Sequence, residues 1–355
     1  MAKARSWITR QFDIIRLLVA VLIAILLAIA VICIISDDPG LAVSKLFGGP
    51  LQSIRRFGNV VELMIPLTFA GLSITVMFSA NQFNMGAEGA FYAGGAIASV
   101  LALSLSLPPV VSPLLSILAA GLVGGCICAI SGFLKVKFGT SELVASLMLN
   151  YVFFYLFKYI LFNNPFKDAA SGYISTYKMD ETARLSGLFP GTRIHTGLLL
   201  MVLFVLLAAL YMKRTRSGFS LKLTGENQAF ARYSGVKVGG VILAAQFIGG
   251  LIGGVGGAVQ VLGIYERFQW VSLPGYGFDG VIVAILARKN PWLVPVAAFF
   301  LAYLRIGSDM MSSASDVTNE LISIIQSIII LFVSAKVFLE AYRQRMVTKE
   351  AVGHE

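Results

Sequence analysis

Charged side chains are scarce in this sequence. They make up 13% of the 355 residues, about half the share found in an average soluble domain, while apolar residues reach 57%. With a mean hydropathy of +0.82, a chain of this length has too little polar surface to cover water-soluble domains. The composition argues against a soluble enzyme, excludes a disordered chain, and predicts an integral membrane protein.

Histidine and cysteine are also rare. The three cysteines, Cys33, Cys126 and Cys128, all lie inside apolar runs. Cys126 and Cys128 are two positions apart, so on a helix their side chains point about 200° from each other. This pattern suits neither a disulfide scaffold nor a zinc site. His195 and His354 fall at a loop edge and in the C-terminal tail, and the chain has no H-E-x-x-H, G-x-S-x-G or P-loop motif. We therefore expect no catalytic residue, no metal site and no cofactor bound by this chain.

Long apolar runs dominate what is present, and they predict an all-α, polytopic helical bundle with about 9–10 transmembrane segments. The run over 14–35 follows a basic start and is too long for a typical cleaved signal, so we expect a retained first span with a cytoplasmic N-terminus. The runs lie at 14–35, 60–80, 83–107, 110–134, 143–162, 196–212, 238–264, 278–287, 292–306 and 321–335. We expect one transmembrane domain over 1–355.

The net charge of +10 is distributed unevenly between the loops. Crossing each run in turn places 18 of the 28 Lys and Arg residues on the cytoplasmic side, in 3–16, 135–137, 213–237, 288–289 and 336–349. This asymmetry follows the positive-inside rule rather than the pattern of a nucleic-acid-binding surface. It predicts a multi-pass protein of the cytoplasmic (inner) membrane, with a cytoplasmic tail over 336–355.

Two apolar runs are interrupted. Polar and glycine residues break the stretch from Ser79 to Gly89, and the apolar part of Pro274 to Ala287 spans only half a membrane. Irregular backbone at membrane depth requires protein or a water-filled cavity around it, so one or two broken or re-entrant helices are expected here. Because each break contains an acid, we place Glu88 and Asp279 near a transport path, with a position at the membrane interface as the alternative.

Two further acids, Glu62 and Glu142, lie within three residues of the start of their runs. For these we expect helix N-termini at the membrane interface, where negative charge is favourable, and Ser141 before Glu142 also indicates a helix start. In the 238–264 run, Gly249, Gly253 and Gly257 recur at every fourth position, which predicts a nearly side-chain-free face for close helix packing.

Polar and aromatic residues also occur inside the spans. Asn150 and Gln260 fall at span depth, with Tyr151 beside Asn150 and Phe83 in the first break. Buried amides often only bridge helices, but amides and aromatic rings that face a common cavity would suit a neutral ligand with a planar ring.

The segment 213–237 is the longest expected cytoplasmic loop. A helix-compatible stretch over 227–234 lies between Gly225 and Gly235, which are natural start and stop signals. Its small and aromatic residues suit insertion into a cleft on a cytoplasmic partner, whereas the simpler interpretation is an ordinary solvated loop.

The sequence G-E-N-Q-A-F-A-R-Y-S-G-V over 225–236 resembles the coupling-helix motif of ABC importer permeases. The chain is similar to the branched-chain amino acid, ribose and nucleoside permease family, and most of all to its nucleoside-type members. Further motifs stand in the expected order at 83–89, 146–151, 183–197, 274–286 and 319–326. The chain departs from the family at Gln228, where proline is common, and at Ala90, where glutamine is usual.

This resemblance implies the partners and the site residues. The partners would be a cytoplasmic ABC ATPase that binds ATP and Mg, a second permease subunit that is identical or homologous, and an extracytoplasmic substrate-binding lipoprotein. The residues expected to dock on the ATPase are Gly225, Glu226, Asn227, Ala229, Ala231, Arg232, Tyr233, Ser234 and Gly235. The residues expected near the substrate path are Phe83, Asn84, Glu88, Asn150, Tyr151, Gln260 and Asp279.

The resemblance thus predicts a non-catalytic permease subunit that moves a small polar solute, most favourably a nucleoside, across the membrane. A simple sugar or a riboflavin-like vitamin would fit the same architecture. Two interpretations from other classes remain: an ion-coupled secondary transporter with Glu88 or Asp279 as the coupling carboxylate, and a membrane scaffold without transport.

Overall fold

The computed structural model describes residues 26–27, 29–34, 36–105, 107–163 and 165–317, together with 324 and 327. The predicted first span over 14–35 and the last apolar run over 321–335 lie largely outside these residues, and the tail over 336–355 lies entirely outside them. The chain forms two compact units. Unit 1 comprises 1–56 with 303–355, and unit 2 comprises 57–302. The expectation of a single domain stays a prediction.

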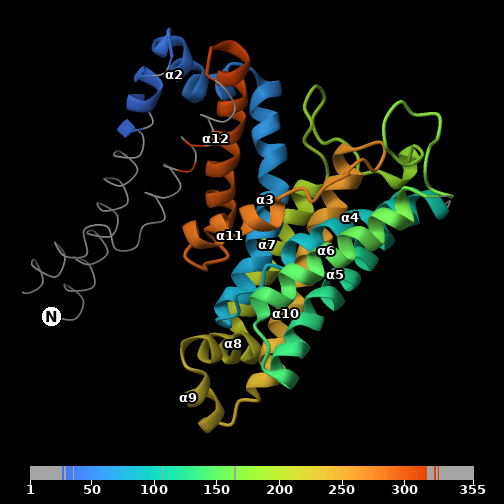
Figure 1. Ribbon diagram of the computed structural model, residues 1–355, viewed down its shortest axis with the longest axis vertical. Helices are drawn as coiled ribbons and strands as arrows, with labels where there is room; N and C mark the ends of the chain where they lie inside the picture. The colour runs from blue at the N-terminus through green and yellow to red at the C-terminus, as the bar shows by residue number, and fades with distance from the viewer. Residues whose placement is uncertain are drawn as a thin grey trace, which may run out of the picture. The chain divides into compact units, whose positions relative to one another are not determined.

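Helices make up the regular structure of the described residues, as the sequence predicts (Figure 1). Seven of them are long and apolar enough to cross a membrane. These are α3 (Ile54–Ser79), α4 (Ala87–Ser104), α5 (Val111–Phe138), α6 (Glu142–Leu161), α7 (Gly197–Arg214), α10 (Val238–Ile264) and α12 (Val294–Ala314). The fold class of a polytopic helical bundle is therefore confirmed.

Both predicted interruptions are present. Helix α3 ends at Ser79 and α4 begins only at Ala87, and Asn81 between them has a φ of 55°. The second break holds α11 (Tyr276–Leu286), an 11-residue helix that begins directly after Gly275 at φ 84°. Only a residue without Cβ adopts that backbone conformation without strain, so Gly275 sets the direction in which α11 leaves the preceding loop.

The core of unit 2 is the close packing of α10 against α5 and α4. A Cβ on Gly254 would overlap the backbone of Ala120 on α5, and a Cβ on Gly257 would overlap the carbonyl group of Phe91 on α4. The predicted side-chain-free face of α10 is therefore confirmed, and it lets backbone approach backbone as in other small-residue membrane helices.

The starts of two helices test the expectations for Glu62 and Glu142. Helix α6 begins at Glu142, and Lys135 Nζ lies 2.7 Å from Glu142 Oε2. The expectation that Glu62 lies at a helix N-terminus is wrong: α3 begins at Ile54, so Glu62 lies inside the helix, more than two turns from its start. The apolar run that starts at Val60 concealed this, because the first turns of α3 are rich in polar residues and glycine.

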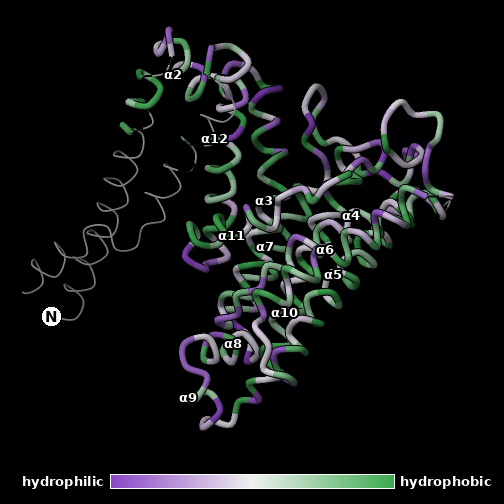
Figure 2. The backbone as a smooth tube through the Cα atoms, in the orientation of Figure 1, coloured by the Kyte–Doolittle hydropathy of each residue, from purple (hydrophilic) through white to green (hydrophobic). Residues whose placement is uncertain are grey.

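The loops of unit 2 gather at two ends (Figure 1). At one end lie α8 (Arg216–Glu226) and α9 (Gln228–Tyr233), and Gly225 packs on the carbonyl group of Ser79. At the other end the loop over 163–196 meets the segment after α10, where Met179 N–H donates to Glu266 O at 2.8 Å. Figure 2 shows hydrophilic residues around α8 and α9 and mostly hydrophobic residues along the long helices of this unit. Segments predicted for the same side of the membrane thus share an end.

Unit 1 holds α2 (Pro39–Gly48), the 3-10 turn η1 (Gly49–Leu51) and the C-terminal part of α12. Asp38 caps α2 by accepting a hydrogen bond from Leu41 N–H at 3.0 Å. Asp316 closes the unit, since its carboxylate accepts from Ser36 Oγ at 2.5 Å and from Asp37 N–H at 2.7 Å.

Candidate functional site

Asn84 lies in the first break and is fully buried among polar side chains. Its Nδ2 donates to Ser131 Oγ at 2.7 Å and to Gln246 Oε1, and its Oδ1 accepts from Gly86 N–H at 2.5 Å. The side chain therefore joins the segment before α4 to α5 and α10.

Glu88 lies in the first turn of α4 and caps the N-terminus of α11. Its Oε1 accepts from Gly275 N–H at 2.6 Å, and its Oε2 accepts from Gly277 N–H at 2.5 Å. The carboxylate thus pairs two of the amides that a helix N-terminus leaves without partners, and its charge lies at the positive end of the helix dipole. Asp279, in the first turn of the same helix, is also buried.

Asn150 on α6 bridges to the start of α4. Its Oδ1 accepts from Gly89 N–H and its Nδ2 donates to Met85 O, both at 2.9 Å. The neighbouring Tyr151 is 55% exposed. Asn84, Glu88 and Asn150 are therefore gathered around the start of α4, where each bonds to protein groups.

Phe83 lies in the same break and is partly exposed. Its ring stacks on Phe78 with 4.9 Å between the centroids, and its N–H donates to Glu142 Oε1 at 3.4 Å. These contacts place Phe83 at the end of unit 2 that also carries α8 and α9.

Gln260 lies at a point where three helices meet. Its Nε2 donates to Glu62 Oε1 of α3 at 3.3 Å and to the hydroxyl oxygen of Tyr276, the first residue of α11, at 3.4 Å. Gln260 Oε1 is buried and accepts no hydrogen bond from the described residues. Sequence reasoning missed Tyr276 as a site residue and misplaced Glu62, because the contact between Glu62 and Gln260 joins positions 198 residues apart.

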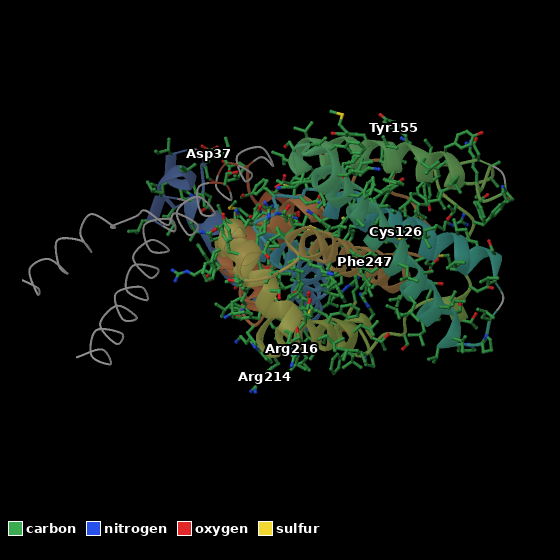
Figure 3. All side chains as sticks on the ribbon, turned by 90° about the horizontal axis from the view of Figure 1, so that it is seen from below. Asp37, Cys126, Tyr155, Arg214, Arg216 and Phe247 are labelled. Carbon is green, nitrogen blue, oxygen red and sulfur yellow. The ribbon has the colours of Figure 1, made fainter. Side chains whose placement is uncertain are left out.

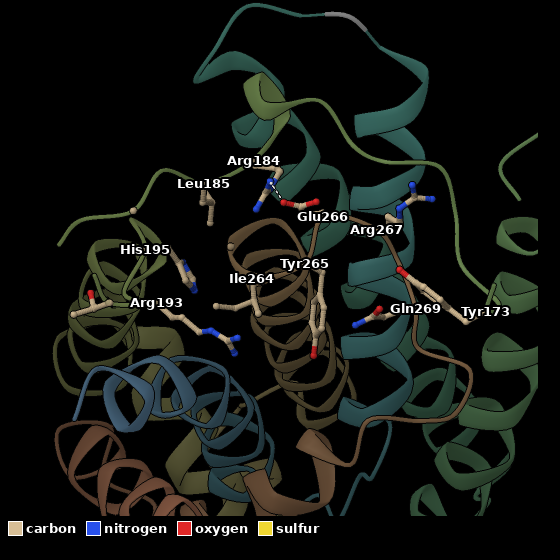
Figure 4. A pocket seen from close by; sticks show the side chains of 13 residues that line it. Tyr173, Arg184, Leu185, Arg193, His195, Ile264, Tyr265, Glu266, Arg267 and Gln269 are labelled. Atoms are coloured by element: carbon tan, nitrogen blue, oxygen red, sulfur yellow. Dashed lines mark hydrogen bonds and ion pairs between the residues drawn. The ribbon is translucent and has the colours of Figure 1, made fainter. Parts of the chain in front are cut away.

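A cavity of about 580 Å³ opens between the loop over 163–196 and the segment after α10 (Figure 4). Three arginines line it, Arg184, Arg193 and Arg267, together with the carboxylate of Glu266. Arg184 Nη1 lies 3.4 Å from Glu266 Oε1, an ion pair drawn in Figure 4. The hydrogen bond and charge of Lys178 lower the pKa of Glu266, so this acid is ionised at neutral pH.

His195 also lines the cavity but is itself almost fully buried. Its Nδ1 accepts from Gly197 N–H at 3.2 Å, and the imidazole lies so close to Gly263 that a Cβ there would overlap the ring. Desolvation by burial lowers the pKa of His195 to about 4, so the ring is neutral at physiological pH.

The predicted coupling segment forms two helices rather than one. Helix α8 precedes the predicted stretch over 227–234 and was not anticipated in the sequence analysis, which treated Gly225 as a start signal for a single helix. Thr215 caps α8 by accepting from Gly218 N–H at 3.0 Å, and Gly225 lies in its last turn. In Figure 3 the side chains of Arg214 and Arg216 extend outward at the junction of α7 and α8.

Helix α9 covers Gln228–Tyr233, within the predicted stretch over 227–234. Asn227 caps it through Oδ1, which accepts from Phe230 N–H at 3.0 Å, so a good helix start exists without the proline that is common at 228. Ala231 is buried against Val238 and Ile242, and it anchors α9 to the start of α10.

The outer face of α9 and its flanks is open. Tyr233 is 94% exposed, and the other exposed members of the predicted docking set are Glu226, Asn227, Ala229, Arg232, Ser234 and Gly235. Gly225 is half-buried. A capped helix that is anchored by one alanine and presents an aromatic ring and a cation is suited to insertion into a groove on another protein.

The fold and these surfaces define a polytopic helical membrane protein with a capped, exposed helix at one end of unit 2 and a polar cavity at the other. Over residues 57–334 the chain matches the family of branched-chain amino acid transport system permease components, and it belongs to this family. It is a permease subunit of an ABC transporter.

Curated relatives agree with this assignment. The chain is 31% identical to the glucose ABC transporter permease protein of Haloferax volcanii, over 86% of this chain and 83% of the relative. It is 30% identical to the guanosine ABC transporter permease protein of Bacillus subtilis, over 88% and 92%. It is 28% identical to a nucleoside ABC transporter permease protein of Lactococcus lactis subsp. cremoris, over 91% of both chains. No solved structure matches the chain.

Proposed function

We propose that this chain is the permease subunit of an ABC importer for nucleosides. The observation that carries the proposal is the exposed, capped helix α9 on a chain whose relatives include guanosine and nucleoside permeases. ATP and Mg would bind to a separate ATPase chain, and an external lipoprotein would deliver the solute. A second permease subunit, identical or homologous, would complete the path.

The proposed docking surface is formed by α9 and its flanks. Closure of the ATPase would push on α9, and the backbone contact between Gly225 and Ser79 would pass this movement to the end of α3. The anchoring of Ala231 against α10 supports the same role, because a docking helix transmits force only where it is fixed to the spans.

Glucose is the second candidate solute, because the Haloferax relative is a glucose permease. Glucose and ribonucleosides both carry vicinal hydroxyl groups on a ring. A riboflavin-like vitamin shares the hydroxyl groups and belongs in the same screen.

Reconstitution with the ATPase and the binding lipoprotein tests this function. Guanosine or inosine is expected to stimulate ATP hydrolysis and ATP-dependent uptake, and glucose and riboflavin are compared under the same conditions. If none of these solutes stimulates hydrolysis, the substrate assignment is wrong. Uptake that is abolished by collapse of the proton gradient at constant ATP would instead indicate a secondary transporter.

Charge reversal tests the docking surface. Arg232→Glu is expected to reduce uptake at least tenfold while the protein still inserts, because Arg232 lies exposed on α9. Lys167→Glu is the matched control, since Lys167 is exposed in the loop at the opposite end of unit 2. Equal uptake by wild type and Arg232→Glu would contradict the docking assignment.

A further inference from the structure

Glu62, Gln260 and Tyr276 form a polar cluster at membrane depth, which we call the Glu62 cluster. Each comes from a different helix, α3, α10 and α11, and the Gln260 amide joins the other two through its Nε2. Helix α11 begins here after the broken segment, so the cluster lies where the backbone leaves regular structure within the bundle.

The cluster has more hydrogen-bond acceptors than its neighbours satisfy. Gln260 is 2% exposed, yet its Oε1 accepts no hydrogen bond from the described residues. One turn before Glu62 on α3, the buried Asn59 Oδ1 also accepts none from the described residues. Buried acceptors are normally paired, so the unpaired Gln260 Oε1, in the amide that bonds the Glu62 carboxylate, indicates a site for a donor that the described residues do not supply.

Glu62 is only partly buried, although it lies inside a membrane-spanning helix. A carboxylate that faces hydrocarbon is costly, whereas one that faces a water-filled path is not. Irregular backbone at membrane depth, such as the break before Tyr276, is likewise excluded from the lipid surface, because it must be enclosed by protein or line a water-filled cavity. Together with the partial exposure of Glu62, this favours an aqueous path over the lipid surface for the Glu62 cluster.

Two buried aromatic rings, those of Phe91 and Trp270, pack beside the ring of Tyr276. The Phe91 ring lies 4.9 Å from the Tyr276 ring and the Trp270 ring 6.5 Å from it, centroid to centroid. Phe91 and Trp270 are buried, whereas Tyr276 is only partly buried. The Tyr276 hydroxyl is therefore presented by a fixed ring.

The cavity shown in Figure 4 lies next to the cluster. Arg193, one of its lining residues, lies close enough to Glu62 for the two charges to attract each other. Gly263, another lining residue, follows Gln260 by three positions on α10, which is close to one helical turn. A solute in the cavity would meet the Glu62 cluster as it moves inward.

We propose that the Glu62 cluster binds the vicinal hydroxyl groups of the solute during translocation. The hydroxyl groups donate to the Glu62 carboxylate and to Gln260 Oε1. The Tyr276 hydroxyl accepts from Gln260 Nε2 and so orients the amide toward the solute. This inference rests on the proposed function, because it identifies the part of the solute that the permease contacts. A solute that lacks one hydroxyl leaves an acceptor of the cluster unpaired and is disfavoured.

Paired uptake measurements test this proposal. In proteoliposomes with the ATPase and lipoprotein, kcat/KM is compared for inosine, 2′-deoxyinosine and 3′-deoxyinosine. Because the same lipoprotein delivers each solute to every variant, its own preference cancels when variants are compared. The ratio of inosine to deoxyinosine is expected to fall at least tenfold in Glu62→Gln and at least threefold in Tyr276→Phe. Glu181→Gln, an exposed carboxylate in the loop over 163–196, is the matched control and is expected to keep the wild-type ratio.

The outcomes separate the two proposals. If the ratio in Glu62→Gln and Tyr276→Phe stays within twofold of wild type, or if uptake of all three solutes falls equally, the hydroxyl-binding role is refuted. If Glu62→Gln does not insert, Tyr276→Phe decides alone, because it keeps the ring and removes only the hydroxyl. A wild-type transporter that imports glucose but no nucleoside refutes the nucleoside assignment instead, and the same ratio is then measured with glucose and 2-deoxyglucose.

Discussion

The carboxylate of Glu88 is predicted to hold the N-terminus of α11 in place. In Glu88→Ala, the N–H groups of Gly275 and Gly277 lose their buried acceptors, at a cost of about 1–3 kcal/mol each. Loss of negative charge at the helix N-terminus adds to this cost, while relief from burying a carboxylate offsets part of it. We expect a net loss of about 2–4 kcal/mol in the local stability of α11.

Hydrogen exchange on the full-length protein in nanodiscs measures this change. Because about 1.4 kcal/mol corresponds to a factor of ten, the amides over 275–279 are expected to exchange about 30 to 700 times faster in Glu88→Ala. Glu88→Gln keeps one acceptor oxygen and should show roughly half of the free-energy loss.

Ser99→Ala is the control, because among the described residues Ser99 Oγ bonds within α4, to Gly95 O. Its α11 amides should exchange as in wild type. Exchange over 275–279 that stays within threefold of wild type in Glu88→Ala would refute the capping role.

Three further predictions follow from the described contacts. Gly225→Val places a side chain against the carbonyl group of Ser79, so ATP-dependent uptake should fall at least tenfold at normal membrane levels; uptake within twofold would contradict this. Asn227→Ala removes the cap of α9 at a cost of about 1 kcal/mol, which should speed amide exchange over 228–233, and Asn227→Ser should restore protection. The pKa of His195 is about 4 in the folded protein and 6.5 ordinarily. The contribution of the neutral ring to the stability of the folded state is therefore present above pH 6.5 and is lost as the pH falls to 4. This lowers the free energy of unfolding by about 3 kcal/mol between pH 6.5 and pH 4. The unfolding temperature of His195→Asn should therefore depend less on pH over this range than that of wild type. An unchanged pH dependence would count against a buried neutral ring.

The spans could be predicted from the sequence because a membrane requires about 20 apolar residues in a row. Both breaks were also predictable, since polar residues and glycine interrupt those runs. The start of α3 was not predictable from hydropathy, because Arg55, Arg56 and Asn59 in its first turns do not resemble a span. Helix α8 was missed for a similar reason, as its short polar sequence contains two glycines, Gly218 and Gly225.

The candidate site was predictable only in part. Gln260 stood out as an amide inside an apolar run, but its partners Glu62 and Tyr276 become visible only when three helices are packed together. His195 gave no local signal, because its burial depends on the absence of a side chain at Gly263, 68 positions further along the chain. Contacts between distant positions depend on helix register, which composition and spacing do not determine.

Helix α11 is held at both ends. Glu88 of α4 bonds its first amides, and Lys289, just after its end, donates from Nζ to Phe78 O near the end of α3 at 2.9 Å. Arg288 and Lys289 adopt φ values of 51° and 58°, a turn that aims the Lys289 amine at that carbonyl. A short helix that is bonded at each end to a different span connects the two spans rather than forming a hinged segment. Helix α11 thus links α3 to α4, and we expect these three helices to move as one body.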